Sequence, residues 1–214
     1  MKKAIISLLM LVPLLTNAQN TWERPDEQQE TTTKQKAKTT DVKDYQYAKY
    51  LGNVVPEVNG EVVWEKNFIN DKSADENYAA MLSLLTAMTK DEGQLEGSKV
   101  SLVNKAEHKI VCHFEEWMVF ANTLLSLDRT RFIYTLIAEC HDQKVNVKIF
   151  RINYWYEEQR DGGSRFRAEE WITDKYALNK KRTRLAKISG KFRRKTVDRV
   201  EEIFDHIGVS IMAK

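Results

Sequence analysis

The sequence predicts an α+β fold in which two helices pack on one face of an antiparallel sheet. Apolar and polar residues alternate through most of 99–156, and apolar residues recur at helical spacing within 73–88 and again within 191–211. Alternation is typical of strands with one buried face, and helical spacing is typical of amphipathic helices. Elements that each have a single apolar side are stable when they form two layers around a shared core.

The folded part is expected to begin with a strand at Val62–Phe68, followed by a helix. Ser73, with Glu76 three residues later, forms a capping box, in which each side chain satisfies a backbone N–H of the first turn. Apolar residues then follow at helical spacing: Tyr78, Met81, Leu82, Leu85 and Met88. Because Gly93 lies beyond them, the helix is expected to end before that residue.

Four strands joined by short turns are predicted next, at 99–104, 109–120, 131–141 and 144–156. In the fourth strand the alternation shifts between Ile149 and Ile152, which predicts a β-bulge near Phe150–Arg151. Arg165–Ile172 is a candidate for a last strand. A C-terminal helix at about 191–211 is predicted from one apolar stripe: Val197, Val200, Ile203, Phe204, Ile207 and Ile211.

The two faces of this sheet are expected to differ. Apolar side chains of the second and third strands share the face that should form the core: Ile110, Cys112, Phe114, Met118, Phe120, Phe132, Tyr134, Leu136, Ala138 and Cys140. The opposite face is polar: Lys109, His113, Glu115, Arg131, Thr135, Glu139 and His141. Trp117 and Trp155 also fall on this second face, so they are the tryptophans expected to be exposed.

The first residues have the features of a cleavable export signal. Lys2 and Lys3 precede an apolar run, Ala4–Leu15, and small residues end at Ala18. We therefore predict a signal peptide at 1–18, a disordered polar linker at 19–49 and a single α+β domain at 50–214, with its core at about 60–156. The protein is expected to be exported, to the periplasm or beyond, and no later stretch is apolar enough to cross a bilayer.

Charge and motifs argue against several classes of function. The net charge is +3, and removal of Lys2 and Lys3 with the signal peptide leaves +1, which gives no general attraction to nucleic acid or acidic membranes. The sequence contains no GxSxG, HExxH, P-loop or dinucleotide-binding motif. We accordingly predict no catalytic residue, no metal ligand and no cofactor.

Three local phrases resemble a known family: Val54–Trp64, Lys72–Tyr78 and Ser189–Asp198. The family consists of secreted Bacteroides-type proteins with a domain of unknown function, number 4468, whose fold is like that of the TATA-binding protein (TBP). The similarity covers roughly Gly60–Ile152. It implies a TBP-like β-α-β-β-β-β-α layout with a curved sheet, and it implies no known activity. Promoter DNA is not an expected partner, because a fold does not determine a function and the protein is expected to be exported.

Two Cys–His pairs, Cys112–His113 and Cys140–His141, are candidates for a metal site or a disulfide. Neighbouring side chains on a strand point to opposite faces, so four ligands from these pairs cannot converge on one zinc ion. Both cysteines fall on the core face, and the export compartment is oxidising. The alternatives are a Cys112–Cys140 disulfide and two buried free thiols; the thiols are favoured, because sequence alone does not set the strand register.

The one local concentration of charge lies in 175–199, before and within the C-terminal helix. Its basic residues include Lys180, Lys181, Arg182, Arg184, Arg193 and Arg194. Two interpretations remain: a solvated basic face, which is the usual one for a charge run, and a site for an acidic partner such as an anionic glycan or a phosphate group.

The leading functional hypothesis is a non-enzymatic module of the cell envelope that uses its sheet face to hold a protein, a peptide or a glycan. The predicted binding face comprises His113, Glu115, Trp117, His141 and Trp155. Two alternatives are kept: a hydrolase of envelope polymers with Glu or Asp as acid and base, and a periplasmic metal-binding protein that uses the exposed histidines.

Overall fold

The computed structural model describes residues 47–123 and 126–212. The predicted signal peptide at 1–18, and the predicted linker up to residue 46, lie outside these residues. Within the two described ranges, no helix is both long and apolar enough to cross a lipid bilayer.

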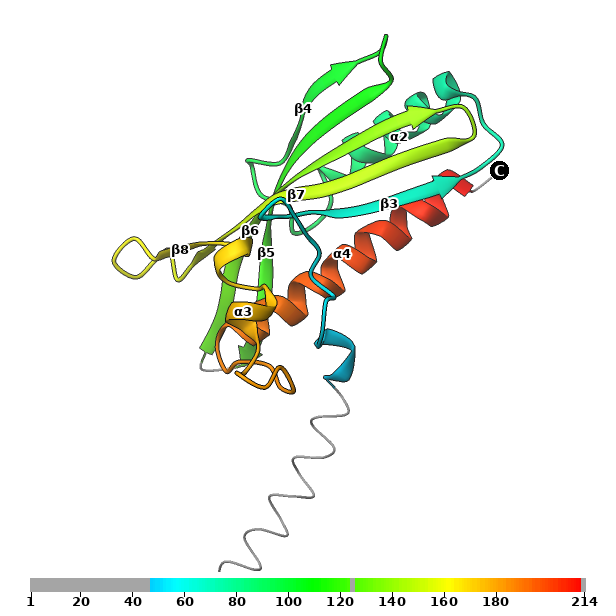
Figure 1. Cartoon of the computed structure of the whole chain (residues 1–214). Helices are drawn as coiled ribbons and strands as arrows, with labels where there is room; N and C mark the ends of the chain where they lie inside the picture. Colours follow the sequence, from blue (N-terminus) through cyan, green and yellow to red (C-terminus); the bar gives the residue numbers. More distant parts are fainter. Residues whose placement is uncertain (1–46, 124–125, 213–214) are drawn as a thin grey trace, which may run out of the picture. The chain divides into compact units, whose positions relative to one another are not determined.

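The described residues form one large sheet with helices packed on it (Figure 1). The elements in chain order are η1 (Ala48–Tyr50), β1 (Glu57–Val58), β2 (Glu61–Val62), β3 (Trp64–Ile69), α2 (Ala74–Met88), β4 (Lys99–Asn104), β5 (Lys109–Thr123), β6 (Ser126–His141), β7 (Lys144–Tyr156), β8 (Ser164–Arg167), η2 (Ala168–Glu170), α3 (Asp174–Ala177) and α4 (Ser189–Met212).

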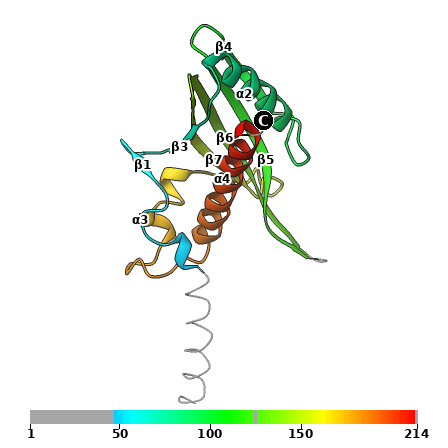
Figure 2. The same ribbon diagram turned by 90° about the vertical axis from the view of Figure 1, so that its right-hand side faces the viewer.

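The large sheet is antiparallel throughout, in the order β3-β7-β6-β5-β4, with β8 paired to β7. It is open and curved, and Figure 2 shows α2 and α4 on the same side of it. The predicted α+β fold class, with an antiparallel sheet and two helices on one face, is confirmed. A separate short hairpin, β1–β2, turns at Asn59 and Gly60, which both have the positive φ that a tight hairpin turn requires.

The start of α2 is fixed by the capping box that the sequence predicts. The Ser73 backbone N–H donates to Glu76 Oε2 at 2.8 Å, and the Glu76 N–H donates to Ser73 Oγ at 3.4 Å. Asp142, in the turn between β6 and β7, accepts a hydrogen bond from the Ala74 N–H at 2.8 Å. The first turn of the helix is therefore tied to one end of the sheet.

One hydrophobic core lies between the sheet and the helices. The predicted alternation is present, because every second residue of β5 from Ile110 to Met118 and of β6 from Phe132 to Cys140 is buried. Phe192 of α4 is the centre of an aromatic cluster, with ring centroids within 6.2 Å of five others: Phe120, Tyr154, Tyr156, Phe166 and Trp171. These contacts attach the first turns of α4 to β5, β7 and β8.

The predicted bulge in β7 is present. Thr135 pairs with Phe150 whereas Ile133 pairs with Asn153, so β7 contains one extra residue, and Arg151 has φ 52°. The extra residue returns Ile152 and Tyr154 to the core face. It also fixes which side chains beyond it, including Trp155, lie on the opposite face.

The predicted last strand at Arg165–Ile172 differs from the structure. Only β8 (Ser164–Arg167) is extended, and the chain then turns through η2. The turn allows Trp171 to stack on Phe166, with ring centroids 3.9 Å apart, and buries Ile172 in the core. Tertiary packing of these apolar residues therefore ends a strand that local alternation would have continued.

Candidate binding face of the sheet

The face of the sheet opposite the helices, here called the outer face, carries a row of four side chains directly across four strands. The strand register pairs Trp117 of β5 with Arg131 of β6, Arg131 with Trp155 of β7, and Trp155 with Arg165 of β8. Side chains at directly opposed positions lie on the same face and touch. Indole and guanidinium groups therefore alternate along this Trp–Arg row.

Cation–π contacts hold the row together. The Arg131 guanidinium lies 5.7 Å from the Trp117 ring centroid and 5.1 Å from that of Trp155. Arg165 lies 4.1 Å from the Trp155 ring, and Arg129, the neighbour of the row on β6, lies 3.6 Å from the Trp117 ring. All four distances fall within the roughly 6 Å range of a favourable contact. The two tryptophans are thus half-buried by arginines rather than by the core.

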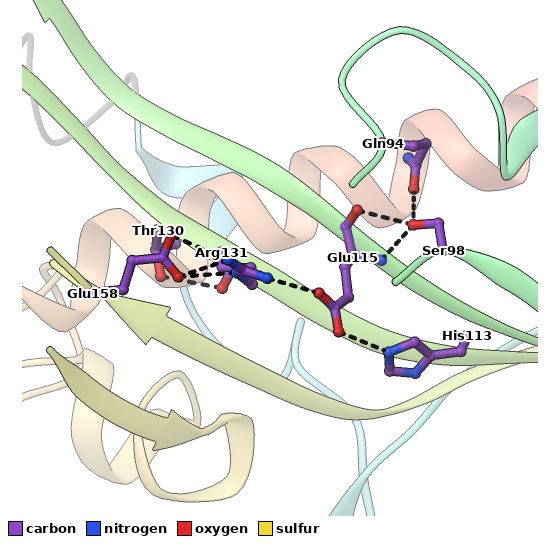
Figure 3. Close-up of polar contacts among 7 residues, drawn as sticks. All are labelled: Gln94, Ser98, His113, Glu115, Thr130, Arg131 and Glu158. Atoms are coloured by element: carbon purple, nitrogen blue, oxygen red, sulfur yellow. Dashed lines mark hydrogen bonds and ion pairs between the residues drawn. The ribbon is translucent and has the colours of Figure 1, made fainter. Parts of the chain in front are cut away.

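Two carboxylates bind the central arginine (Figure 3). Arg131 donates from Nε and Nη2 to the two oxygens of Glu158, at 3.0 and 3.1 Å, and from Nη1 to Glu115 Oε2 at 3.0 Å. The second oxygen of Glu115 lies 3.1 Å from His113 Nε2. Such a paired arrangement fixes the guanidinium plane between the two indoles.

The backbone around Glu115 is held from the loop before β4. The Glu115 N–H donates to Ser98 Oγ at 2.8 Å, and its carbonyl oxygen accepts the Leu95 N–H at 2.7 Å. A Cβ atom at Gly97 would lie 2.5 Å from the Glu115 carboxyl carbon. Glycine at this position therefore leaves room for the carboxylate that orients Arg131.

Glu115 and Arg131 are both charged at neutral pH. Burial opposes ionisation of Glu115, but its hydrogen bonds to His113 and Arg131 outweigh this effect and lower its pKa. The hydrogen bond to Glu158 raises the pKa of Arg131, and the hydrogen bond to Glu115 raises it further. Together they outweigh burial, which lowers it. Glu115 is therefore already deprotonated at neutral pH and cannot act there as the acid of a carboxylate pair. The cluster is suited to recognition by charge and hydrogen bonding.

The structure brings four residues of the predicted binding face together and separates the fifth. His113, Glu115, Trp117 and Trp155 lie in or beside the Trp–Arg row. His141 does not: His113 pairs with Thr135, and His141 lies six residues further along β6, which is about 20 Å in an extended strand. A shared site for the two histidines is therefore wrong. Among the residues that the structure describes, no group of three or more His, Cys, Asp or Glu could hold a metal ion.

The disulfide considered from the sequence is also wrong. Cys112 and Cys140 are both buried and free. The register of β5 and β6 places Cys112 opposite Leu136, four residues from Cys140, which is about 13 Å along the strand. A disulfide requires Cα atoms within about 7 Å of each other. The predicted faces of the two cysteines were right, but the register keeps them apart.

Both thiols are expected to react slowly with an aromatic disulfide reagent in the folded protein. Burial raises the pKa of Cys112 and of Cys140 to about 12, so the reactive thiolate is scarce, and the reagent cannot reach either sulfur. Titration without reductant should detect two thiols rapidly in guanidinium chloride and almost none in buffer. Absence of both thiols in the denatured protein would show that a disulfide had formed.

The predicted basic segment divides into exposed and buried parts. Lys180, Lys181, Arg182 and Arg184 are exposed, and Arg194 is half-buried. Arg193 is completely buried, so its place in a solvated basic surface is wrong. Its guanidinium binds backbone carbonyls of Tyr50, Gly52 and Ile172 and the carboxylate of Asp174, which makes it part of the core.

Sequence reasoning missed three residues of the outer face: Arg129, Glu158 and Arg165. Arg129 precedes Arg131 by two positions, so alternation could have placed it on the same face. Arg165 could not be placed, because its neighbour depends on the β7 bulge and on the pairing of β8. Glu158 lies in the loop after β7, where alternation gives no information.

Comparison with known proteins identifies the family. A family model described as a domain of unknown function (DUF4468) with TBP-like fold matches residues 64–155. The crystal structure of a DUF4468 family protein from Bacteroides ovatus is 36% identical, covers 78% of this chain and 96% of that chain, and gives a TM-score of 0.72. A TBP-like protein from Parabacteroides distasonis, at 22% identity, covers 75% of this chain and 99% of that chain with a TM-score of 0.60, and it supports the fold alone. No curated protein matches the sequence. The TBP-like fold expected from the sequence is therefore confirmed, and the chain belongs to the DUF4468 family.

Proposed function

We propose that this protein is an exported binding module of the cell envelope that holds an extended, carboxylate-bearing partner on the outer face of its sheet. The partner is a segment of a protein or peptide, or an acidic glycan. The observation that supports the proposal is the Trp–Arg row, Trp117, Arg131, Trp155 and Arg165, which crosses four strands on the face that the helices leave open.

The two outer arginines supply the contacts to the partner. Arg131 is paired with two carboxylates, Glu115 and Glu158, and serves to position the indoles. Arg129 and Arg165 are seated on indole rings, and neither has a carboxylate of the described residues within ion-pair distance. A guanidinium with a fixed plane and free N–H groups binds a carboxylate at little cost in side-chain entropy.

The length of the row suits an extended chain. Neighbouring strands lie about 4.8 Å apart, so β5 to β8 spans about 14 Å, the length of roughly four residues of an extended peptide. Both indoles are partly exposed between the two cations, although arginines cover ring faces and the Trp155 Nε1–H donates to the Gly162 carbonyl oxygen at 2.8 Å. The row can therefore contact apolar groups between two carboxylates of one partner.

The features of the N-terminus support export. Lys2 and Lys3, the apolar run Ala4–Leu15 and the small residue Ala18 form the three parts of a signal peptide. Envelope proteins and acidic envelope polymers are then the partners within reach of the outer face.

Replacing Arg165 with glutamine should weaken binding of an acidic oligopeptide or a uronic-acid oligosaccharide at least about tenfold, because a hydrogen-bonded charge pair is lost. Trp155→Ala should weaken it similarly, because Arg131 and Arg165 lose the ring on which both rest. Isothermal titration of the full chain with both ligands, and with a neutral oligosaccharide, measures the effect and separates peptide from glycan.

Lys148→Gln is the matched control. Lys148 lies on β7, on the other side of the bulge from Trp155 and outside the Trp–Arg row. Its replacement by glutamine removes one positive charge, as Arg165→Gln does. It should change affinity less than about twofold, as expected for an exposed charge. An equal loss from Lys148→Gln and Arg165→Gln would contradict the proposal, as would the absence of binding to either acidic ligand.

A further inference from the structure

A pocket lies between residues around η1 and the loop between α3 and α4. Figure 1 shows the backbone of these two segments near the start of α4. Its volume is about 510 Å³. The lining residues come from three places in the chain: the segment around η1 (Tyr47 and Leu51), the loop before α4 (residues 183–187) and the first turns of α4 (Gly190, Lys191 and Arg194). None of these residues belongs to the Trp–Arg row.

Every charged residue that lines this pocket is cationic: Arg184, Lys187, Lys191 and Arg194. The ammonium group of Lys191 is paired with Asp128 at 2.7 Å. Lys187 and Arg194 have no carboxylate of the described residues within ion-pair distance, and the nearby Asp174 is bound to Arg193 at 2.8 Å. The pocket therefore has a positive potential that the described acids do not neutralise.

The loop that carries the cations is held in one conformation. The Asn179 side chain accepts hydrogen bonds from the N–H groups of Thr183 and Arg184, at 2.9 and 3.3 Å. The Ala186 N–H donates to Ala177 O at 2.7 Å. Leu185 packs closely on α4: a Cβ atom added at Gly190 would lie 2.7 Å from the Cβ atom of Leu185. The geometry of the pocket is thus set before any ligand arrives.

Apolar groups form the rest of the wall. Leu185 is half-buried and packs against the hydrophobic core. The Tyr47 ring lies beside that of Tyr50, with centroids 6.4 Å apart, and the Arg194 guanidinium lies 5.4 Å from the Tyr47 ring. One pocket thus combines cations with an aromatic ring and aliphatic side chains.

We propose that this pocket binds a phosphate group attached to an apolar moiety. Arg194 and Lys187 contact the phosphate, because a doubly charged anion matches two cations that have no carboxylate of the described residues within ion-pair distance. Tyr47 and Leu185 contact the apolar part. The phosphate is carried by a soluble phosphate ester or by the headgroup of an anionic lipid, and these two sources share the same chemistry at the pocket. The inference does not depend on the proposed function of the outer face.

The test compares two double variants of the full chain that remove the same charge. Lys187→Gln with Arg194→Gln changes the pocket, whereas Lys180→Gln with Lys181→Gln changes exposed lysines of the same segment that do not line it. The probes are 1-naphthyl phosphate, inorganic phosphate and vesicles of phosphatidylglycerol or phosphatidylcholine. Binding is followed by two-dimensional NMR for the soluble probes and by co-sedimentation for the vesicles.

The unaltered protein should bind 1-naphthyl phosphate saturably and more tightly than inorganic phosphate. The pocket variant should weaken this binding at least about tenfold, and the control less than about twofold. If only the pocket variant loses binding to phosphatidylglycerol vesicles, the phosphate belongs to a lipid headgroup. If the pocket variant binds these vesicles as the unaltered protein does, the phosphate belongs to a soluble ester. Equal losses in both variants, or no saturable binding of 1-naphthyl phosphate, would overturn the proposal. The Trp–Arg row remains intact in both variants, so its own test is unaffected.

Discussion

Replacing Arg193 with methionine should lower the free energy of unfolding by about 3–5 kcal/mol, the usual cost of removing one partner from a buried ionic group. Arg193 is fully buried in α4. It donates to the carbonyl oxygens of Tyr50, Ile172 and Gly52 at 2.7, 2.9 and 2.6 Å, and to Asp174 Oδ1 at 2.8 Å. Methionine fills much of the space but supplies no donor, so all four hydrogen bonds from the guanidinium are lost.

The same substitution at the next position is the control for Arg193. Arg194 is half-buried, and its only described contact is with the Tyr47 ring, so Arg194→Met should cost less than about 1 kcal/mol. Urea unfolding followed by circular dichroism measures both variants. A similar cost for the two would mean that the buried hydrogen bonds of Arg193 do not hold the segment around η1 to α4.

Replacing Arg199 with methionine should lower the free energy of unfolding by about 2–3 kcal/mol, somewhat less than for a fully buried pair because Arg199 is partly exposed. Glu116 lies on the core face of β5 and is nearly buried. Arg199 reaches it from α4 with Nε and Nη2, at 2.9 and 2.8 Å, and the Gln94 side chain donates to the same carboxylate at 2.9 Å. Without Arg199, Glu116 retains one neutral donor for a buried charge.

A double-mutant cycle checks that this cost comes from the unpaired carboxylate. Glu116→Leu combined with Arg199→Met should be more stable than Arg199→Met alone, because an apolar pair replaces a buried ion without a partner. Glu202→Gln removes the exposed contact of Arg199, at 3.2 Å, and should change stability by less than about 0.5 kcal/mol. A double variant less stable than the single one would contradict this account.

Much of the fold could be predicted because its signals are local. The capping box at Ser73 and Glu76, the alternation through β5 and β6, and the bulge after Ile149 each depend on residues close in sequence. The last strand failed for the opposite reason. Its end is set by the stacking of Trp171 on Phe166 and by the burial of Ile172, which involve contacts that alternation does not encode.

The candidate site was predicted in part. Alternation placed Glu115, Trp117 and Trp155 on the outer face, because the face of a residue depends only on the strand period. It could not show that Trp155 lies opposite both Arg131 and Arg165, since this depends on the register of two strand pairs and on the bulge. For the same reason it put His113 and His141 together, and it left a Cys112–Cys140 disulfide open beside the favoured free thiols, which the structure shows.

The sequence by itself determined the fold class, the two faces of the sheet and the family, because each rests on local periodicity or on short local phrases such as Val54–Trp64. Only the tertiary structure decided which charges are solvated and which are internal. Arg193 and Arg194 are adjacent in one basic run, yet one is buried and binds four acceptors, and the other lines an open pocket. Successive residues of a helix point about 100° apart, so neighbours in a charge run meet different surroundings.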